Sequence, residues 1–148
     1  MDQAPSGPTQ DTLFDLHRSF GALILALAVV RWINRLAGGT PATFPVEPRW
    51  QRIAAHAVHE LLYVLIVAMP ILGWLGTSAF GAPITVFWLF QLPALVAKDE
   101  PLANAVLQVH ATLGFVLAGL VVIHVAAALY HHYVLRDQAL ARMLRGTP

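Results

Sequence analysis

The sequence contains no cysteine and very little charge. Its 148 residues include no Cys, and 11% are Asp, Glu, Lys or Arg, against roughly a quarter in ordinary soluble proteins. The lack of cysteine excludes disulfides, thiolate-held zinc, iron–sulfur clusters, a cysteine nucleophile and thioether-attached haem. The formal net charge of +1 leaves no basic surplus for nucleic acid. Any metal or redox chemistry must therefore use histidine, of which there are seven.

Apolar residues are abundant and gather in long blocks. They make up 57% of the chain, and the mean hydropathy is +0.64. Three blocks approach the roughly 20 residues needed to cross a bilayer's hydrocarbon core, and we expect spanning helices at about 13–36, 53–75 and 105–134. The predicted fold class is an all-α membrane protein, an antiparallel transmembrane helix bundle over residues 13–135. We expect residues 1–12 to form a disordered external tail and residues 136–148 a cytoplasmic tail.

A further apolar stretch between the second and third helices is broken by prolines. Pro83, Pro93 and Pro101 interrupt it, so it is too short to span a membrane. Its aromatic residues, which include Phe87 and Trp88, are typical of the headgroup region. We therefore expect a short segment that lies at the membrane interface.

The basic residues lie unevenly around these blocks. Seven of the nine flank the connection between the first two helices or lie in the C-terminal tail: Arg31, Arg35, Arg49, Arg52, Arg136, Arg142 and Arg145. The other side has only Arg18 and Lys98. Because cytoplasmic loops carry an excess of Lys and Arg, we expect a multi-pass protein of the bacterial inner membrane with its N-terminus outside and its C-terminus in the cytoplasm.

All seven histidines fall inside the expected helices, and five of them lie at two depths within the expected bundle. His17 and His110 each lie about one turn inside an outer helix end. His124 follows His110 by 14 residues, which returns it to within about 40° of the same face, about 21 Å deeper. His56 and His59 lie close to the depth of His124. Ionisable residues inside a membrane are costly, so their default interpretation is functional.

Each of the two outer histidines precedes a glycine by four residues. The pairs are His17 with Gly21 and His110 with Gly114, and helical spacing puts each glycine beside its imidazole. Two facing imidazoles with small neighbours are what a haem with two axial histidines requires. Such an iron has no open position, which suits electron transfer better than oxygen binding. Arg18 either pairs with a haem propionate or extends to the membrane interface.

A non-redox interpretation competes with this one. A single histidine in a membrane often only forms a hydrogen bond between helices, and His56 and His59 lie near an interface where histidine is tolerated. The alternative is therefore a membrane packing subunit, or a metal-binding subunit that uses His56 and His59. Glu60 is the only further ligand nearby, so the metal-binding form of this alternative stays minor.

Several stretches of the chain together resemble the bacterial cytochrome b-561 family, which is related to the cytochrome b subunits of membrane hydrogenases. They are LHRSFG, HAVHELLYVLIVAMPILGW, GAPITVFWLFQLP and VHATLGFVLAGLVVIHVAAALYHHYVLRD. The resemblance implies an antiparallel bundle of four helices with two b-type haems, one near each face. It assigns His17 and His110 to the outer haem and His124 to the inner haem.

The resemblance also implies a role in electron transfer, and it leaves the second ligand of the inner haem unidentified. The role is electron transfer from a donor on the outer face to membrane quinone. A small donor such as superoxide would make the chain an enzyme, and a redox protein partner would make it an electron-transfer subunit. The family's first helix, which carries the second inner ligand, has no counterpart here. Truncation, a helix from a second chain, or substitution by His59 would account for this. We predict one firmly bound outer haem, with the inner site empty or weakly occupied.

Overall fold

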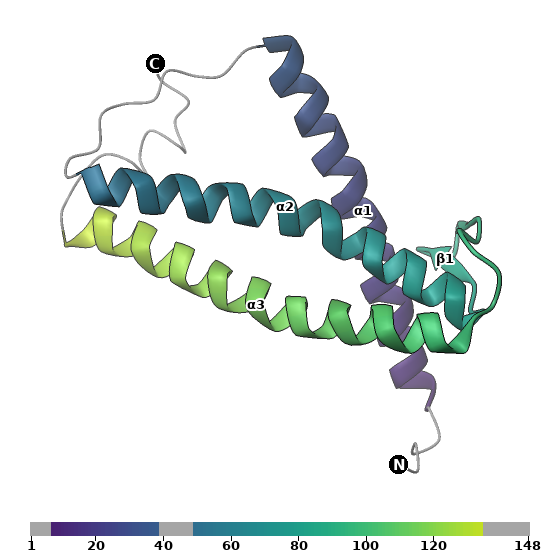
Figure 1. Ribbon diagram of the computed structural model, residues 1–148. Coiled ribbons are helices and arrows are strands. Elements are labelled where there is room, and N and C mark those ends of the chain that lie inside the picture. Colours follow the sequence, from purple (N-terminus) through teal and green to yellow (C-terminus); the bar gives the residue numbers. More distant parts are fainter. Residues whose placement is uncertain (1–6, 39–48, 135–148) are drawn as a thin grey trace.

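The computed structural model describes residues 7–38 and 49–134, which form three long helices and one small hairpin (Figure 1). The elements in chain order are α1 (Pro8–Gly38), α2 (Arg49–Phe80), β1 (Ile84–Val86), β2 (Phe90–Leu92) and α3 (Glu100–Tyr133). All three helices are long and apolar enough to cross a membrane. The predicted all-α membrane fold with three spanning helices is therefore confirmed.

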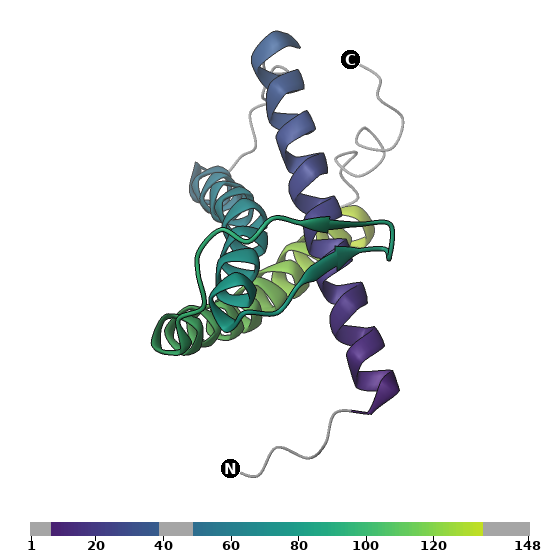
Figure 2. The ribbon, with the colours of Figure 1, turned by 90° about the vertical axis from the view of Figure 1, so that its right-hand side faces the viewer.

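Helices α2 and α3 run side by side and antiparallel, while α1 crosses them obliquely (Figures 1 and 2). The hairpin lies where α2 ends and α3 begins, which we call the hairpin end of the molecule. The opposite end, where α2 begins and α3 ends, is the far end. This arrangement puts the first half of α1 beside the hairpin end.

The helices start earlier than the sequence predicted. Helix α1 begins at Pro8 and not at Leu13, so residues 8–12, which we assigned to a disordered tail, are helical. A proline is tolerated in the first turn because the N–H group that it lacks would have no partner within the helix. The remainder of the two expected tails, residues 1–6 and 136–148, lies outside the described residues.

The start of α3 is capped by a side chain. Asp99 is the N-cap, and its carboxylate accepts a hydrogen bond of 3.0 Å from the backbone N–H of Leu102. Pro101 follows in the first turn, where its fixed φ suits the helix. The cap moves the helix start to Glu100, five residues before the predicted start at Ala105.

Small residues let α2 and α3 approach closely. A Cβ atom at Gly76 would lie 2.7 Å from Cδ2 of Leu107, which no real side chain tolerates. A Cβ atom at Gly114 of α3 would lie 3.6 Å from Cε of Met69, an ordinary contact. Close approach through glycine is the usual way for helices to associate in lipid, where burial of apolar surface gives no drive.

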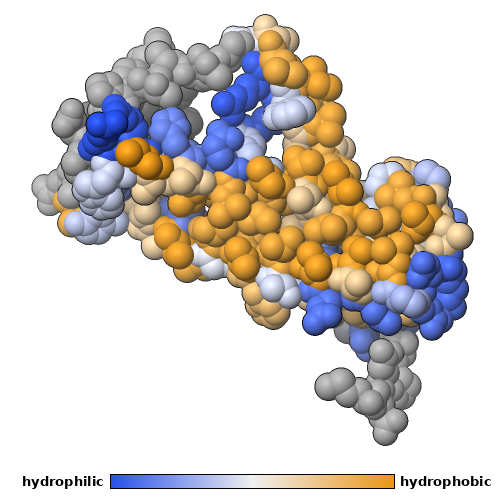
Figure 3. All heavy atoms as spheres, viewed as in Figure 1, coloured by the Kyte–Doolittle hydropathy of each residue, from blue (hydrophilic) through white to orange (hydrophobic). Residues whose placement is uncertain are grey.

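The surface of the described helices is apolar along their middle and hydrophilic toward the ends (Figure 3). Few apolar side chains of residues 7–38 and 49–134 are buried, and they are Leu65, Met69, Ala79, Ile84, Val86 and Ala103. Large apolar residues such as Phe115 and Val122 are instead 82% and 68% exposed. Hydrocarbon solvates such a surface and water does not, so the chain is a multi-pass membrane protein.

The expected interfacial segment contains a hairpin that the sequence did not predict. Strands β1 and β2 pair antiparallel, with Val86 opposite Phe90. Phe87 and Trp88 in the turn have φ values of 45° and 59°, a left-handed conformation that is uncommon for large residues. The turn closes through a 2.9 Å hydrogen bond from the N–H of Leu89 to the carbonyl of Val86.

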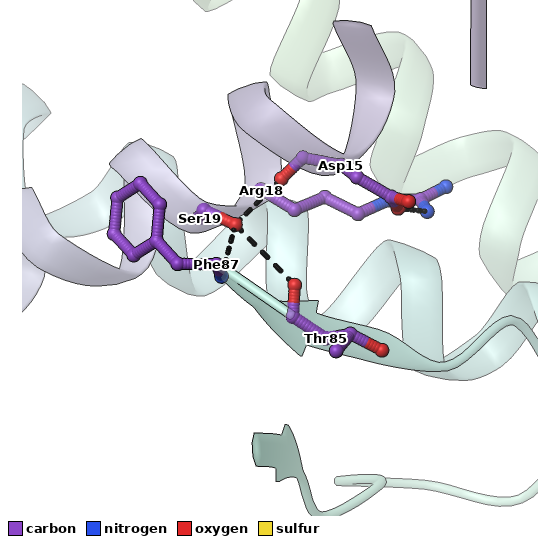
Figure 4. Close-up of polar contacts among 5 residues, drawn as sticks. All are labelled: Asp15, Arg18, Ser19, Thr85 and Phe87. Atoms are coloured by element: carbon purple, nitrogen blue, oxygen red, sulfur yellow. Dashed lines mark hydrogen bonds and ion pairs between the residues drawn. The ribbon is translucent and has the colours of Figure 1, made fainter. Parts of the chain in front are cut away.

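A buried serine joins this hairpin to α1 (Figure 4). The hydroxyl of Ser19 is 2.7 Å from the carbonyl of Asp15, to which it donates, and 3.3 Å from the carbonyl of Thr85. It accepts a hydrogen bond of 2.8 Å from the backbone N–H of Phe87. Ser19 is only 1% exposed. The contact positions α1, and with it the neighbouring His17, against the hairpin end.

Candidate functional site

Two histidines from different helices meet at the hairpin end. His17 of α1 and His110 of α3 have ring centroids 5.9 Å apart, with the rings perpendicular at 89°. The side chain of His17 is exposed and that of His110 is partly buried. The chain is thus folded so that two imidazoles 93 residues apart in sequence become neighbours.

The ring of His110 is oriented by α2. Its Nδ1 atom lies 3.1 Å from the backbone carbonyl oxygen of Met69. Because a carbonyl can only accept, Nδ1 carries the proton and donates it, and Nε2 keeps a free lone pair. Metal-binding histidines usually donate their other ring N–H to a carbonyl or carboxylate in this way. The hydrogen bond to Met69 therefore leaves Nε2 as the nitrogen of His110 through which a metal could bind.

A glycine on α2 provides room for this ring. A Cβ atom at Gly73 would lie 3.2 Å from Cε1 of His110 and 3.5 Å from its Nδ1. Sequence reasoning missed both Gly73 and the Met69 carbonyl. Every residue has a carbonyl, so no sequence signal identifies Met69. For Gly73 the only available signal was a small residue three positions after Pro70 in an apolar helix.

The two glycines singled out from the sequence have different surroundings. Nothing lies within 4 Å of a Cβ atom built at Gly21, so the space beside it is open. The corresponding position at Gly114 is filled by Cε of Met69 at 3.6 Å. The space beside Gly21 is thus open, whereas Gly114 of α3 lies against Met69 of α2.

The cations at the hairpin end are paired with carboxylates. Arg18 forms an ion pair of 3.3 Å with Asp15 one turn earlier in α1, and its guanidinium also lies over the ring of Phe14 at 5.8 Å. Lys98 forms an ion pair of 3.2 Å with Glu100.

A second pair of histidines lies toward the far end. The ring centroids of His59 on α2 and His124 on α3 are 5.1 Å apart, at an interplanar angle of 69°. His56, one turn before His59, is exposed. The described residues contain no group of three or more metal-binding side chains, so within that part of the chain the metal-site alternative with His56 and His59 lacks a third ligand.

A cluster of arginine and aromatic residues lies between α1 and α2. Arg31 donates hydrogen bonds of 3.0 and 2.8 Å to the hydroxyl of Tyr63, and the guanidinium of Arg35 lies 5.7 Å from the centre of the same ring. Beside them is a cavity of about 320 Å³ lined by Trp32, Arg35, Leu36, Glu60 and Tyr63. The Arg31 contact ties the second half of α1 to α2.

Apolar membrane-spanning helices whose histidines meet in pairs are typical of membrane cytochromes. The fold and the histidine pairs of this chain therefore indicate that class. Residues 1–146 match the prokaryotic cytochrome b561 family. The chain belongs to this family, whose members are membrane cytochromes that carry b-type haem and transfer electrons.

Curated relatives support this assignment along most of the chain. Cytochrome b561 homolog 2 of Escherichia coli is 36% identical over 130 residues, which cover 88% of this chain and 69% of the relative. Cytochrome b561 homolog 1 of the same species is 28% identical over 88% of this chain and 73% of its own length. A probable superoxide oxidase of Yersinia pestis is 32% identical over 129 residues, 87% of this chain and 73% of the relative.

Proposed function

We propose that this chain is a b-type cytochrome of the bacterial inner membrane that passes electrons from a donor on its outer face to membrane quinone. In this proposal His17 and His110 are the two axial ligands of one haem, and Gly21 provides space beside it. The observation that carries the proposal is the meeting of the two imidazoles, with centroids 5.9 Å apart.

The spacing of the rings suits a metal between them. An imidazole nitrogen binds a metal at about 2 Å, so two imidazoles on opposite sides of one iron have centroids roughly 6 Å apart. The observed 5.9 Å therefore needs ring rotation and little backbone movement. The hydrogen bond from Nδ1 of His110 to Met69 leaves Nε2 as the ligating atom.

The ligand set favours electron transfer. A bound b-type haem supplies an iron that changes between its ferrous and ferric states by one electron. His17 and His110 would hold the haem iron between them and would leave no position for oxygen. The carbonyl of Met69 holds the ring of His110 in one orientation.

The test is a reduced-minus-oxidised visible spectrum of the purified protein and of two variants. Wild-type protein should show a six-coordinate, low-spin b-type haem. His17→Ala and His110→Ala should each lose that signal, because a single imidazole leaves the iron five-coordinate and weakly held. An unchanged six-coordinate spectrum in His110→Ala would contradict the ligand assignment. Re-oxidation of the reduced protein by a short-chain quinone, absent in both variants, tests the acceptor.

Superoxide is a second candidate for the donor. It is favoured by the relative from Yersinia pestis, which is named as a probable superoxide oxidase. The ion pairs of Arg18 with Asp15 and of Lys98 with Glu100 reduce the attraction of this end for an anion. Haem reduction by enzymatically generated superoxide, abolished by superoxide dismutase, would support superoxide, and no reduction would favour a protein donor.

A further inference from the structure

We propose that the cavity between the second half of α1 and α2 binds the headgroup of a membrane phospholipid that carries both a phosphate and an ammonium group, as phosphatidylethanolamine does. The cavity has a volume of about 320 Å³ and is lined by Trp32, Arg35, Leu36, Glu60 and Tyr63. Hydrophilic side chains gather there between the two helices (Figure 3). The inference goes beyond the proposed function and does not depend on haem binding.

Two arginines of α1 are held beside this cavity by one tyrosine of α2. Arg31 donates hydrogen bonds of 3.0 and 2.8 Å from Nε and Nη2 to the hydroxyl oxygen of Tyr63. The guanidinium of Arg35 lies 5.7 Å from the centre of the same ring. Because the hydroxyl oxygen accepts from Arg31, its own proton can be donated to a further acceptor. Arg35 and Tyr63 thus offer N–H and O–H donors on one side of the cavity.

The charged side chains of the cavity are not neutralised by one another. Within residues 7–38 and 49–134 the ion pairs involve other side chains, at the hairpin end, and Arg31, Arg35 and Glu60 form none. Ionisable side chains of membrane-spanning helices are costly, and they pair with one another or serve a bound group. A ligand with both charges, placed between Arg35 and Glu60, would provide a partner for each.

These two side chains select the chemistry of the ligand. A guanidinium binds phosphate oxygens through paired N–H donors, and a primary ammonium donates its N–H groups to a carboxylate. A phosphate beside Arg35 and an ammonium beside Glu60 are the two charged groups of a phosphoethanolamine headgroup. Phosphatidylglycerol has the phosphate alone, and the quaternary ammonium of phosphatidylcholine has no N–H to donate. Both should therefore bind less tightly.

The position of the cavity favours a lipid over a free anion. Arg35 lies three residues before Gly38, the last residue of α1, and so about 5 Å from the helix end. Basic pockets between spanning helices on the cytoplasmic side bind lipid headgroups, and tryptophan is typical of the membrane interface. Trp32 and Leu36 are 66% and 78% exposed, so they offer apolar surface to the first carbons of the acyl chains.

The experiment is native mass spectrometry of the full-length protein, purified in detergent and stripped of bound lipid. Phosphatidylethanolamine, phosphatidylglycerol and phosphatidylcholine with identical acyl chains are added separately, and the bound fraction gives each Kd. Wild-type protein should bind one phosphatidylethanolamine about tenfold more tightly than either other lipid, because each of these lacks the charge-assisted contact with Glu60. Inorganic phosphate and free phosphoethanolamine, added as competitors at the lipid concentration, should not displace the lipid.

Two substitutions that remove a charge separate the two contacts. Arg35→Gln should weaken the binding of phosphatidylethanolamine and of phosphatidylglycerol about tenfold, because both lose the phosphate contact. Glu60→Gln should weaken phosphatidylethanolamine alone and so abolish the preference between these two lipids. Arg52→Gln is the matched control, since it neutralises an exposed arginine of α2 that does not line the cavity, and the preference should persist. Far-ultraviolet circular dichroism checks that each variant is folded.

Several results would overturn the proposal. Equal affinity of wild-type protein for the three lipids would do so, and this comparison decides the matter even where a variant fails to fold. Unchanged lipid binding in Arg35→Gln would also contradict it. Displacement of the lipid by inorganic phosphate would assign the cavity to a free anion, and displacement by a short-chain quinone would make it a quinone site. Because haem is not measured, each of these failures would leave the assignment of His17 and His110 intact.

Discussion

At the scale of single residues, the orientation of the His110 ring is determined by contacts with α2 and not by its own helix. The Met69 carbonyl accepts from its Nδ1 atom at 3.1 Å, and Gly73 leaves space for the ring. The hydrogen bond fixes the tautomer, and the glycine fixes how closely the ring can approach α2. Ligand orientation by such a partner commonly matters nearly as much as the ligand itself.

Replacing Gly73 by alanine should disturb the outer haem site. The new Cβ would lie 3.2 Å from Cε1 of His110 and would push the ring away from Met69. Overpacking of this kind costs about 1–3 kcal/mol, so haem affinity at the outer site should fall roughly tenfold or more. Titration of the apoprotein with haem, followed by Soret absorbance, measures the change.

Gly119→Ala is the matched control for this variant. Nothing lies within 4 Å of a Cβ atom at Gly119, so the same chemical change meets no neighbour. Alanine also favours the helix over glycine by about 1 kcal/mol, and this gain applies at both positions. Equal haem affinity in the two variants would show that the contact between Gly73 and His110 does not matter for the site.

The sequence identified the candidate histidine ligands, but it did not identify the groups that orient them. His17, His110 and His124 were recognisable because imidazoles are rare inside apolar helices. The spacing along α3 also predicted that His110 and His124 share a face. Met69 could not be identified, because its contribution is a backbone carbonyl and depends on how α2 is rotated against α3. Contacts between the two helices, such as that of Gly76 with Leu107, are visible only in the three-dimensional structure.

At the scale of elements, α1 is held to the rest of the molecule near the hairpin end by one buried hydroxyl. Ser19 connects α1 to both the carbonyl of Thr85 and the N–H of Phe87 (Figure 4). The ring of Phe20, the next residue in α1, also meets the ring of Phe87 at 5.4 Å between centroids. This attachment determines where His17 lies relative to α3.

Ser19→Ala should therefore weaken the attachment of α1. The N–H of Phe87 would lose its acceptor in a partly buried position, which costs up to about 1–3 kcal/mol in the free energy of unfolding. Thermal unfolding in detergent, followed by circular dichroism, measures the loss. Thr112→Ala is the control, because the hydroxyl of Thr112 bonds only to the Gln108 carbonyl within its own helix, at 2.9 Å. An equal effect of the two substitutions would contradict a structural role for the Ser19 contact.

The elements themselves were predictable to different degrees. Hydropathy alone identified the three spanning helices, because lipid imposes a long apolar run on any helix that crosses it. The helix starts were predicted too late. For α3 the reason is that Pro101 was taken as a break, although a proline suits a first helical turn. The hairpin escaped prediction because its turn uses Phe87 and Trp88 in a left-handed conformation, without the glycine or asparagine that usually signals such a turn.

At the scale of the whole molecule, the two histidine pairs lie toward opposite ends of the same helix pair. His110 and His124 are 14 residues apart on α3, about 21 Å along its axis. The two pairs would therefore lie near opposite faces of a membrane that the helices span. Which pair faces an external electron donor depends on which end faces the cytoplasm.

The distribution of basic residues predicts that the hairpin end faces outward and the far end faces the cytoplasm. The native chain has no cysteine, so single cysteines report their own side of the membrane without background. Gln91→Cys in β2 and Ala37→Cys at the end of α1 are both at exposed positions, and neither lies in a histidine pair. In intact spheroplasts an impermeant maleimide should label Gln91→Cys and leave Ala37→Cys unlabelled until the membrane is permeabilised. The reverse pattern would put the His17 and His110 pair on the cytoplasmic side and would contradict electron entry at this pair from an external donor.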